Sequence, residues 1–379
     1  MIYLRFCLAI TLLVFLCYFG GYHGQIARQI PAPATFFDPF AGVWQQAEAK
    51  TSSGTHHLSH ALYRGQVIFD KRHVPHIFTT KRTDAAFLQG YCHARHRLWQ
   101  MDISTRATAG RLAEVFGSPM AQRDRLQRRR GLVEAARKAL ATWYEAPPTA
   151  ALLDAYTDGV NAYLSSLSPA DYPLEFKLLG YTPEEWTPLK SALFFKSMAQ
   201  TLCARNHDLE SSTTLALLGD SLFQAIYPEY NPQQSPVIPA HTPWPFTPLE
   251  LSGAADEQLS WLSPFPPLDQ SPAGIGSNNW ALSSYKTATG FPLLANDPHL
   301  RLTLPSIWYE VQIHTSASNS YGVSLPGLPG ILIGFNEKSA WGITNVGQDV
   351  LDWYRIAWTD STHNHYWLDG EATPVNWVI

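Results

Sequence analysis

Hydrophobic and polar residues follow a helical period in the first part of the chain. After Asp84, apolar side chains recur at steps of three and four: Phe87, Tyr91, Ala94, Leu98 and Met101. This spacing predicts an amphipathic helix that Gly110 interrupts. Similar patterns predict further helices at residues 132–145, 149–166 and 187–219. We therefore expect the first 220 residues to be mostly helical.

The pattern changes after residue 277, where short apolar and β-branched runs are separated by turn residues. These runs lie at residues 280–282, 293–295, 309–313, 331–333 and 353–356. Runs of this length between turn signals predict strands rather than helices. A helix-rich part followed by a strand-rich part favours an α+β fold.

A proline-rich stretch separates the two parts. Ten prolines lie between residues 228 and 267, and this density excludes a regular helix or a central strand. We therefore predict a Pro-rich linker or spacer between the helical and the strand-rich regions. The predicted divisions are residues 1–30 as a signal peptide or membrane anchor, 31–226 as the helical region, 227–276 as the spacer and 277–379 as the strand-rich region.

The N-terminus has the properties of an export segment. No residue from 6 to 27 carries a formal charge, and residues 6–19 are almost wholly apolar. These 22 uncharged residues are long enough to span a bilayer. A cleaved signal peptide and an uncleaved anchor both stay open, although a poor small-x-small cleavage pattern favours the anchor. Either one predicts that the rest of the chain lies outside the cytoplasm, in the periplasm or attached to the inner membrane.

Composition and charge exclude some classes of protein. With 379 residues, of which 45% are hydrophobic, the chain can bury a large core. A formal net charge of −4 gives no electrostatic basis for binding nucleic acid. The arginine-rich run at residues 123–130 is expected to be a solvated face. Cys92 and Cys203 are the only cysteines outside the apolar N-terminus, so one disulfide is possible but not implied.

The dipeptide Gly276-Ser277 combines two residue types that suit a self-cleaving peptide bond. Glycine tolerates backbone strain and lets a hydroxyl approach the preceding carbonyl. A serine that becomes a new N-terminus carries a nucleophilic hydroxyl and, in its α-amino group, a base with a pKa of about 8. The alternative is an ordinary Gly-Ser turn before a strand.

Short motifs occur in a fixed order on both sides of Ser277. Before it they include Val74-Pro75-His76-Ile77, Arg97-Leu98-Trp99-Gln100-Met101-Asp102, Gly110-Arg111-Leu112-Ala113-Glu114 and Glu185-Trp186-Thr187-Pro188. From it onward they include Ser277-Asn278-Asn279-Trp280, Asn296-Asp297-Pro298-His299, Ile307-Trp308-Tyr309-Glu310 and Trp341-Gly342. From about residue 65 onward, the series resembles the penicillin acylase family of N-terminal-nucleophile hydrolases, which are made as single-chain precursors.

The resemblance implies the αββα sandwich of these hydrolases and a precursor that cuts itself between Gly276 and Ser277. The resulting α and β chains would stay associated, and Ser277 would act as the nucleophile toward a small N-acyl amide substrate. His299 corresponds to a residue that helps to bind the N-terminal amine and its water. The main-chain N–H of Asn345 corresponds to one of two oxyanion donors.

The same resemblance implies an acyl pocket and a structural calcium ion. Leu300 and Ile333 fall at positions that line the acyl pocket in the family. Calcium requires several oxygen ligands. The matching positions are Glu210, Asp349, Asp352 and the carbonyl of Leu351. We expect no organic cofactor, because the chain contains no dinucleotide or phosphate-binding glycine motif.

Some parts of the family's site have no counterpart before Ile379. They are the asparagine side chain that supplies the second oxyanion donor, further calcium ligands and the rest of the catalytic sheet. We therefore interpret the chain as a C-terminally truncated fragment of an acylase precursor. The alternative hypothesis is a non-catalytic, membrane-anchored binding or scaffold protein that keeps the acylase fold.

Overall fold

The computed structural model divides the chain into two compact units. It describes residues 2–21, 36–46, 54–59, 61–203, 208–228, 242–243, 276–345 and 352–377. The first unit comprises Met1–Leu202 and Pro272–Asn345, and the second comprises Cys203–Ser271 and Val346–Ile379. Helices and strands occupy separate stretches of the chain, which confirms the α+β class. The predicted divisions at residues 30, 226 and 276 stay predictions, and the spacer lies largely outside the described residues.

Most helices of the first unit follow the periodic pattern of the sequence. The predicted helix after Asp84 is α3 (Arg82–Ala109), and it ends at Gly110 in a left-handed conformation. The pattern at 187–219 is not one helix but two, α9 (Pro188–Leu202) and α10 (Asp208–Ile226), and α10 belongs to the second unit. The other helices are α1 (Ile2–Gly21), α4 (Ala113–Phe116), α5 (Ala121–Arg129), α6 (Leu132–Tyr144), α7 (Pro147–Ser165) and α8 (Leu174–Leu179).

Seven strands of the first unit form one sheet in the order β1-β2-β3-β6-β7-β8-β9. Their bounds are β1 Gly54–Ser59, β2 Arg64–Phe69, β3 Pro75–Phe78, β6 Tyr309–His314, β7 Asn319–Ser324, β8 Ile333–Phe335 and β9 Ala340–Trp341. Neighbouring strands are antiparallel except β3 and β6, which are parallel with Ile77 opposite Ile313. The pairing of β3 with β6 therefore joins residues on opposite sides of Ser277.

Two further pairs of strands lie outside this sheet. In the first unit β4 (Gly276–Leu282) pairs with β5 (Leu293–His299), and in the second β10 (His365–Leu368) pairs with β11 (Glu371–Pro374). The prediction of a strand at residues 353–356 is wrong, because these described residues form no strand. Nearby, Trp358 forms an isolated bridge with Tyr366. A hydrophobic run becomes a strand only when a partner strand pairs with its backbone.

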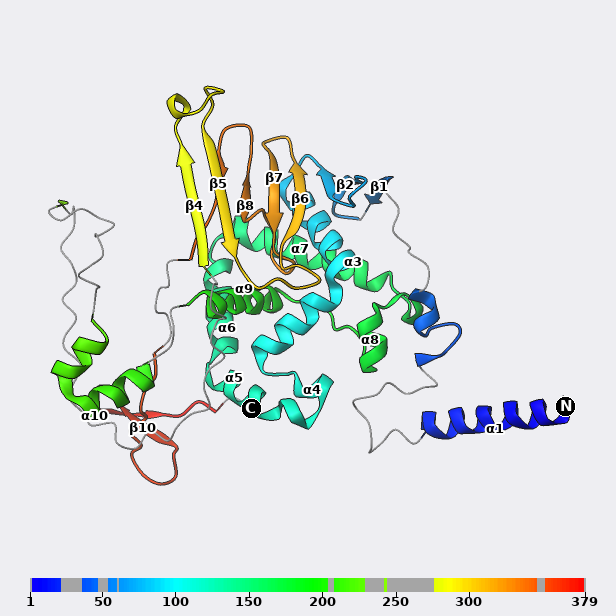
Figure 1. Cartoon of the computed structure of the whole chain (residues 1–379), viewed down its shortest axis with the longest axis horizontal. Helices are drawn as coiled ribbons and strands as arrows, with labels where there is room; N and C mark the ends of the chain where they lie inside the picture. The colour runs from blue at the N-terminus through cyan, green and yellow to red at the C-terminus, as the bar shows by residue number, and fades with distance from the viewer. Residues whose placement is uncertain are drawn as a thin grey trace. The chain divides into compact units, whose positions relative to one another are not determined.

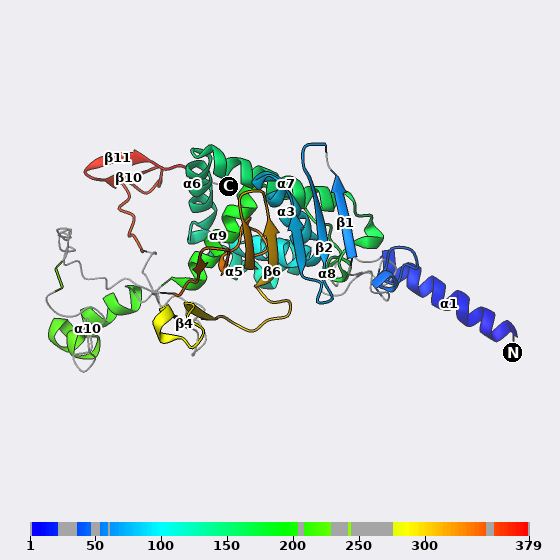
Figure 2. The same cartoon turned by 90° about the horizontal axis from the view of Figure 1, so that it is seen from above.

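Helices α3 and α7 cover one face of the seven-stranded sheet (Figure 1), and the view from above shows the helices behind the strands (Figure 2). The largest core cluster joins the strands to both helices. Val67, Ile77 and Val311 from the strands are fully buried against Leu88 of α3 and Val160 of α7. The amphipathic pattern of α3 therefore exists because this helix packs between the sheet and α7.

Two glycines bring the backbones of α3 and α7 into direct contact. A Cβ atom added to Gly159 would lie 1.9 Å from the carbonyl oxygen of Phe87, and one added to Gly90 would lie 2.2 Å from that of Tyr156. Both distances are far below a normal contact, and a backbone oxygen has no side-chain freedom with which to move away. Any larger residue would therefore push the two helices apart.

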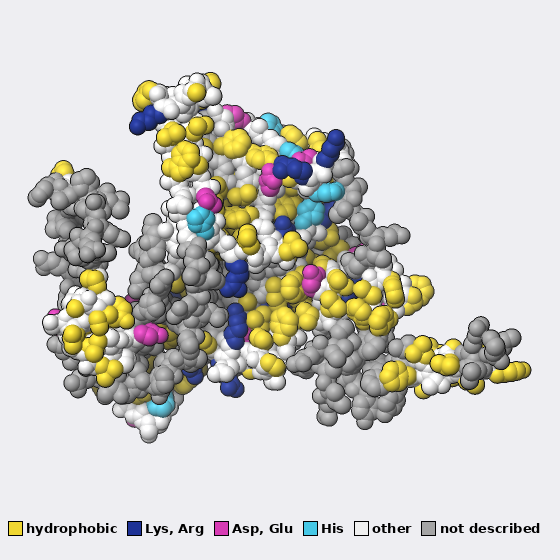
Figure 3. Space-filling view, viewed as in Figure 1, with side chains coloured by type: hydrophobic (Ala, Val, Ile, Leu, Met, Phe, Trp, Pro, Cys, Tyr) yellow, Lys and Arg dark blue, Asp and Glu magenta, His cyan; other side chains and the backbone are white. Residues whose placement is uncertain are grey.

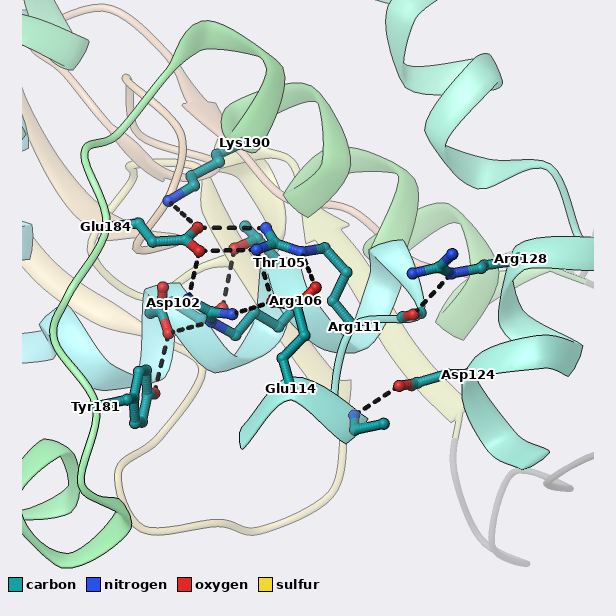
Figure 4. A network of polar contacts seen from close by, with 12 residues as sticks. Asp102, Thr105, Arg106, Arg111, Glu114, Asp124, Arg128, Tyr181, Glu184 and Lys190 are labelled. Carbon is teal, nitrogen blue, oxygen red and sulfur yellow. Dashed lines mark hydrogen bonds and ion pairs between the residues drawn. The ribbon is translucent and has the colours of Figure 1, made fainter. Parts of the chain in front are cut away.

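A buried arginine connects α3 to the segments beside it (Figure 4). The side chain of Arg106 is 5% exposed, and its guanidinium contacts the carboxylates of Asp102, Glu114 and Glu184 at 2.8, 2.8 and 2.6 Å. Arg111 contacts Glu114 and Glu184 at 2.7 Å each. Burial of the guanidinium is unfavourable by itself, and the surrounding carboxylates offset that cost. The network therefore links α3 to α4 and to the segment that precedes α9.

The N-terminal segment forms helix α1 over Ile2–Gly21. Among the residues that the structure describes, no helix is both long enough and apolar enough to cross a membrane.

Substitution of Gly159 by alanine tests the contact between α3 and α7. Helix propensity alone favours alanine by about 1 kcal/mol, whereas the steric contact with Phe87 opposes it. We expect Gly159→Ala to lower the free energy of unfolding by about 2–3 kcal/mol, measured by urea denaturation. The exposed Ala151 of the same helix provides a control, because Ala151→Gly should lose only about 1 kcal/mol. A Gly159→Ala protein as stable as the parent would contradict the contact.

The acid sensitivity of the charged network provides a second test. Hydrogen bonds from Arg111, with the nearby charges of Lys190 and Arg106, lower the pKa of Glu184 to about 2. A carboxylate with a lowered pKa stabilises the fold above about pH 4.5, and this stability is lost as the pH falls toward 2. Glu184→Gln should therefore unfold at a lower urea concentration than the parent at pH 7, and the difference should shrink between pH 4.5 and pH 2.

The matched control for this test is Glu134→Gln, which removes an exposed carboxylate 3.7 Å from Arg137. Exposed pairs contribute little to stability, so this variant should unfold like the parent at both pH values. Equal midpoints for Glu184→Gln and the parent at pH 7 would show that the network does not stabilise the fold.

Candidate functional site

Ser277 is the second residue of strand β4, at the start of the β4–β5 hairpin. The hairpin is antiparallel, with Ser277 opposite Pro298 and Gly276 opposite His299. The Ser277 side chain is half-buried, and its Oγ donates a hydrogen bond to the Gly276 carbonyl oxygen at 2.6 Å. The hydroxyl therefore lies next to the carbonyl group of the preceding residue.

His299 lies across the hairpin from this peptide bond. A Cβ atom built on Gly276 would be 3.9 Å from Nδ1 of His299, so that ring nitrogen lies near Gly276. Adjacent strand side chains point to opposite faces, so His299, which pairs with Gly276, lies on the other face of the hairpin from the Ser277 side chain. The other ring nitrogen, Nε2, lies 2.7 Å from Oδ2 of Asp297. Pairing with a carboxylate favours the tautomer that carries its proton on Nε2, in which Nδ1 is an acceptor.

Asn345 ends the segment that follows β9. Two residues earlier, the backbone of Ile343 forms hydrogen bonds with the side chain of Asn296 on β5, at 3.0 Å to Oδ1 and 2.9 Å from Nδ2. The segment after β9 therefore lies beside the hairpin that carries Ser277. Sequence reasoning placed Asn345 near the site by its match to the family but did not single out Asn296.

Leu300 packs into a small apolar cluster built on α9. Phe194 and Met198 of that helix are buried together with Leu325, and Leu300 lies against them. Ile333 lies on β8 and is half-buried. The apolar spacing of α9 predicted a buried helix face, but it carried no signal that Phe194 and Met198 meet a residue more than 100 positions away.

The loop between β7 and β8, residues 325–330, forms hydrogen bonds with buried polar side chains of α3 and α7. Gln89 of α3 accepts a hydrogen bond from the Gly330 N–H at 2.7 Å and donates one to the Gly330 carbonyl at 2.8 Å. The hydroxyl of Tyr156 on α7 accepts one from the Gly327 N–H at 2.8 Å. His93 contacts that hydroxyl at 2.8 Å, and burial lowers the His93 pKa to about 3.

The space-filling view shows hydrophobic side chains over strands β4 to β8 on the face opposite the helices (Figure 3). Exposed large apolar side chains on β4, β5, β8 and the segment after β9 include Trp280, Leu293, Phe335 and Ile343, with exposed fractions of 53, 49, 54 and 40%. Apolar surface therefore borders the strand that carries Ser277.

The predicted calcium ligands fall in the second unit, and the structure describes two of the four. Glu210 on α10 and Asp352 are both exposed, while Asp349 and Leu351 lie outside the described residues. Within the described part of the chain, no group of three or more His, Cys, Asp or Glu side chains is arranged to bind a metal ion. The calcium site stays a prediction.

Comparison with known families accounts for the order of the motifs. The penicillin amidase family model matches residues 64–378, which is most of the chain. The chain belongs to the penicillin amidase family. The match begins at β2 and includes the helices of the first unit, Ser277 and the strands that follow it.

Several curated members of the penicillin amidase family are similar in sequence. Acyl-homoserine lactone acylase QuiP of Pseudomonas aeruginosa is 35% identical over 79% of this chain and 35% of that protein. Penicillin acylase 2 proenzyme of Pseudomonas sp. strain SE83 is 30% identical over 80% of this chain and 39% of that protein. Penicillin G acylase of Escherichia coli is 23% identical over 75% of this chain and 39% of that protein. The chain therefore spans less than half the length of these relatives.

Among solved structures, a thermostable penicillin G acylase from Alcaligenes faecalis is similar, with a TM-score of 0.38 and 21% identity. The match covers 52% of this chain and 100% of that chain.

Removal of calcium tests the predicted metal ligands. Without a cation, the carboxylates of Asp349 and Asp352 would repel each other, so chelation should lower the thermal unfolding midpoint of the full-length protein. Calcium should restore the midpoint, and Asp352→Asn should make it insensitive to the chelator. Differential scanning calorimetry measures these changes without reference to activity. A midpoint that chelation leaves unchanged would show that the assignment of Glu210, Asp349, Leu351 and Asp352 is wrong.

Proposed function

We propose that this chain belongs to an amidohydrolase precursor that cleaves itself between Gly276 and Ser277 and then uses Ser277 as its nucleophile. The observation that carries the proposal is the contact between the Ser277 Oγ and the Gly276 carbonyl at 2.6 Å. Attack on that carbonyl requires the hydroxyl to lie beside it. Family membership supports the same reaction, and one relative is named a proenzyme.

Self-cleavage proceeds in two steps on this geometry. The Ser277 Oγ attacks the Gly276 carbonyl carbon, the C–N bond breaks, and the acyl group moves from nitrogen to oxygen as an ester. The hydroxyl proton passes to the departing nitrogen. Water then hydrolyses the ester, which leaves a carboxylate on Gly276, a free hydroxyl and a new α-amino group on Ser277. Glycine before the serine keeps this carbonyl accessible.

A base other than the Ser277 nitrogen takes the hydroxyl proton in the first step. Before cleavage that nitrogen is an amide, which is not basic and cannot accept the proton. After cleavage, His299 and its backbone help to bind the new amine and the water that bridges it to the hydroxyl.

The mature protein hydrolyses linear amides of small N-acyl compounds. Ser277 attacks the substrate carbonyl, the α-amino group takes the hydroxyl proton and gives it to the leaving amine, and water releases the acyl group. The main-chain N–H of Asn345 supplies one oxyanion donor. The relatives are named for penicillin and for acyl-homoserine lactones, and both names describe N-acyl compounds.

The acyl group binds against apolar side chains, some of which precede Ser277 in the sequence and some of which follow it. Leu300 packs on Phe194 and Met198, which precede Ser277 and would belong to the α chain. Ile333 lies on β8, in the β chain. An apolar pocket of this kind discriminates by the size of the acyl group, at about 1–3 kcal/mol per methylene.

Both chains remain associated after cleavage. The parallel pairing of β3 with β6 and the bonds from Gln89 and Tyr156 to residues 325–330 join the two sides without a covalent link.

The protein acts outside the cytoplasm, with the uncharged N-terminal segment as the export signal. The alternative, a non-catalytic binding or scaffold protein with the same fold, predicts a chain that is never cut.

Cleavage is tested on the full-length gene product by denaturing electrophoresis with N-terminal sequencing. We expect two chains, one of which begins at Ser277. Ser277→Ala should give one uncut chain with an unchanged fold, because the methyl group removes the nucleophile and little else.

Ser283→Ala is the matched control, since this exposed serine follows β4 and its hydroxyl makes no hydrogen bond that caps the next turn. It should be cut like the parent. An uncut parent chain, or a Ser277→Ala chain cut at the same bond, would contradict the proposal and favour the non-catalytic alternative.

A further inference from the structure

The side chain of Asn296 joins two segments that share no backbone hydrogen bonds in the sheet pairing. Its Nδ2 donates to the carbonyl of Asn278 on β4 at 3.2 Å and to the carbonyl of Ile343 at 2.9 Å. Its Oδ1 accepts from the N–H of Ile343 at 3.0 Å. One side-chain amide therefore connects the strand of the nucleophile to the segment that carries Asn345.

Gly342 makes this arrangement possible. A Cβ atom at Gly342 would lie 2.8 Å from the Cβ, Cγ and Oδ1 atoms of Asn296, which is closer than real Cβ contacts. The φ angle of Gly342 is not positive, so glycine is needed here for space rather than for backbone conformation. Asn296 and Gly342 therefore fit each other as a pair.

The bridge restricts the main chain after Ile343. Asn345 follows Ile343 by two residues, so the two bonds between Asn296 and the backbone of Ile343 limit where the Asn345 N–H can lie. Two residues beyond Asn296 is Pro298, which lies opposite Ser277.

We propose that Asn296 is a positioning residue that fixes the oxyanion donor of Asn345 relative to the hydroxyl of Ser277. This inference rests on the proposed function, because it assigns Asn296 a task in that reaction. Asn296 does not touch the reacting atoms. It acts through the backbone of Ile343 on one side and of Asn278 on the other, so that donor and nucleophile keep a fixed separation.

The inference predicts a specific kinetic change. An oxyanion donor acts on the charge that develops in the transition state and contributes little to substrate binding. Direct removal of such a donor lowers kcat about 100- to 1,000-fold. Loss of its support should cost less, so we expect kcat to fall about 10- to 100-fold while KM changes less than about threefold.

The test uses the full-length gene product and a series of fatty-acyl 4-nitroanilides from acetyl to dodecanoyl. Asn296→Asp keeps the shape and the acceptor for the Ile343 N–H but places a carboxylate oxygen against two carbonyls. Asn279→Ala is the control, because Asn279 lies opposite Asn296 in the hairpin and its side chain is exposed. Phenylmethylsulfonyl fluoride counts the competent sites, so kcat is expressed per site.

We expect Asn296→Asp to lose kcat per site as stated and Asn279→Ala to match the parent. A role in folding alone would lower the number of sites and the thermal midpoint but leave kcat per site unchanged, and this outcome would overturn the inference. If Asn296→Asp yields no folded protein, Gly342→Ala tests the same contact, because the added methyl group displaces the Asn296 side chain. The same loss of kcat per site is expected. The Asn296→Ala/Gly342→Ala double variant should lose no more kcat than Gly342→Ala alone, and full additivity would also overturn the inference.

Failure of the proposed function is recognised separately. In that case the parent protein itself is uncut at Ser277 and turns over none of the anilides. The outcomes that overturn the inference about Asn296 are all measured with a parent that is cut and active.

Discussion

The direct contact between the backbones of α3 and α7 is the constraint on which the rest of the first unit depends. Glycine at positions 90 and 159 removes the side chains that would separate the helices. The close approach places Tyr156 of α7 next to His93 of α3, at 2.8 Å. Tyr156 and Gln89 in turn form hydrogen bonds with the backbone of residues 325–330. A small separation of the helices would withdraw these donors and acceptors, because hydrogen bonds weaken steeply with distance and angle.

The buried network that joins α3 and α7 to residues 325–330 carries no charge. Burial lowers the pKa of His93 to about 3 and raises that of Tyr156 beyond the physiological range, so both side chains stay neutral. Neutral hydrogen bonds in a core avoid the large desolvation cost of charges. The charged residues around Arg106 instead lie within the helical region, on one side of Ser277. The bonds of Gln89 and Tyr156 to residues 325–330 are therefore neutral, whereas the pair Arg72–Glu310, at 3.1 Å, joins residues on either side of Ser277 by charge.

Sequence periodicity located the elements but not the contacts between them. The spacing after Asp84 correctly predicted α3, because an amphipathic helix repeats its apolar face every three or four residues. The same rule predicted α9 and α10 as one helix, because periodicity does not indicate where the chain passes from one compact unit to another. Family motifs supplied Ser277, His299 and Asn345. Asn296 and Phe194 were missed because their neighbours are distant in sequence, and no local pattern encodes a long-range contact.

The hairpin of Ser277 is organised by side chains where its backbone cannot contribute. Pro298 lies opposite Ser277 and has no N–H, so β5 cannot donate a ladder hydrogen bond at that position. The side chains of Asn296 and of the Asp297–His299 pair provide the polar contacts beside it instead. A ladder spreads its energy over many equivalent bonds, whereas one amide concentrates three bonds on one residue. The structure of the hairpin is therefore sensitive to single substitutions at Asn296, whereas the stability of the helical core depends on many buried contacts.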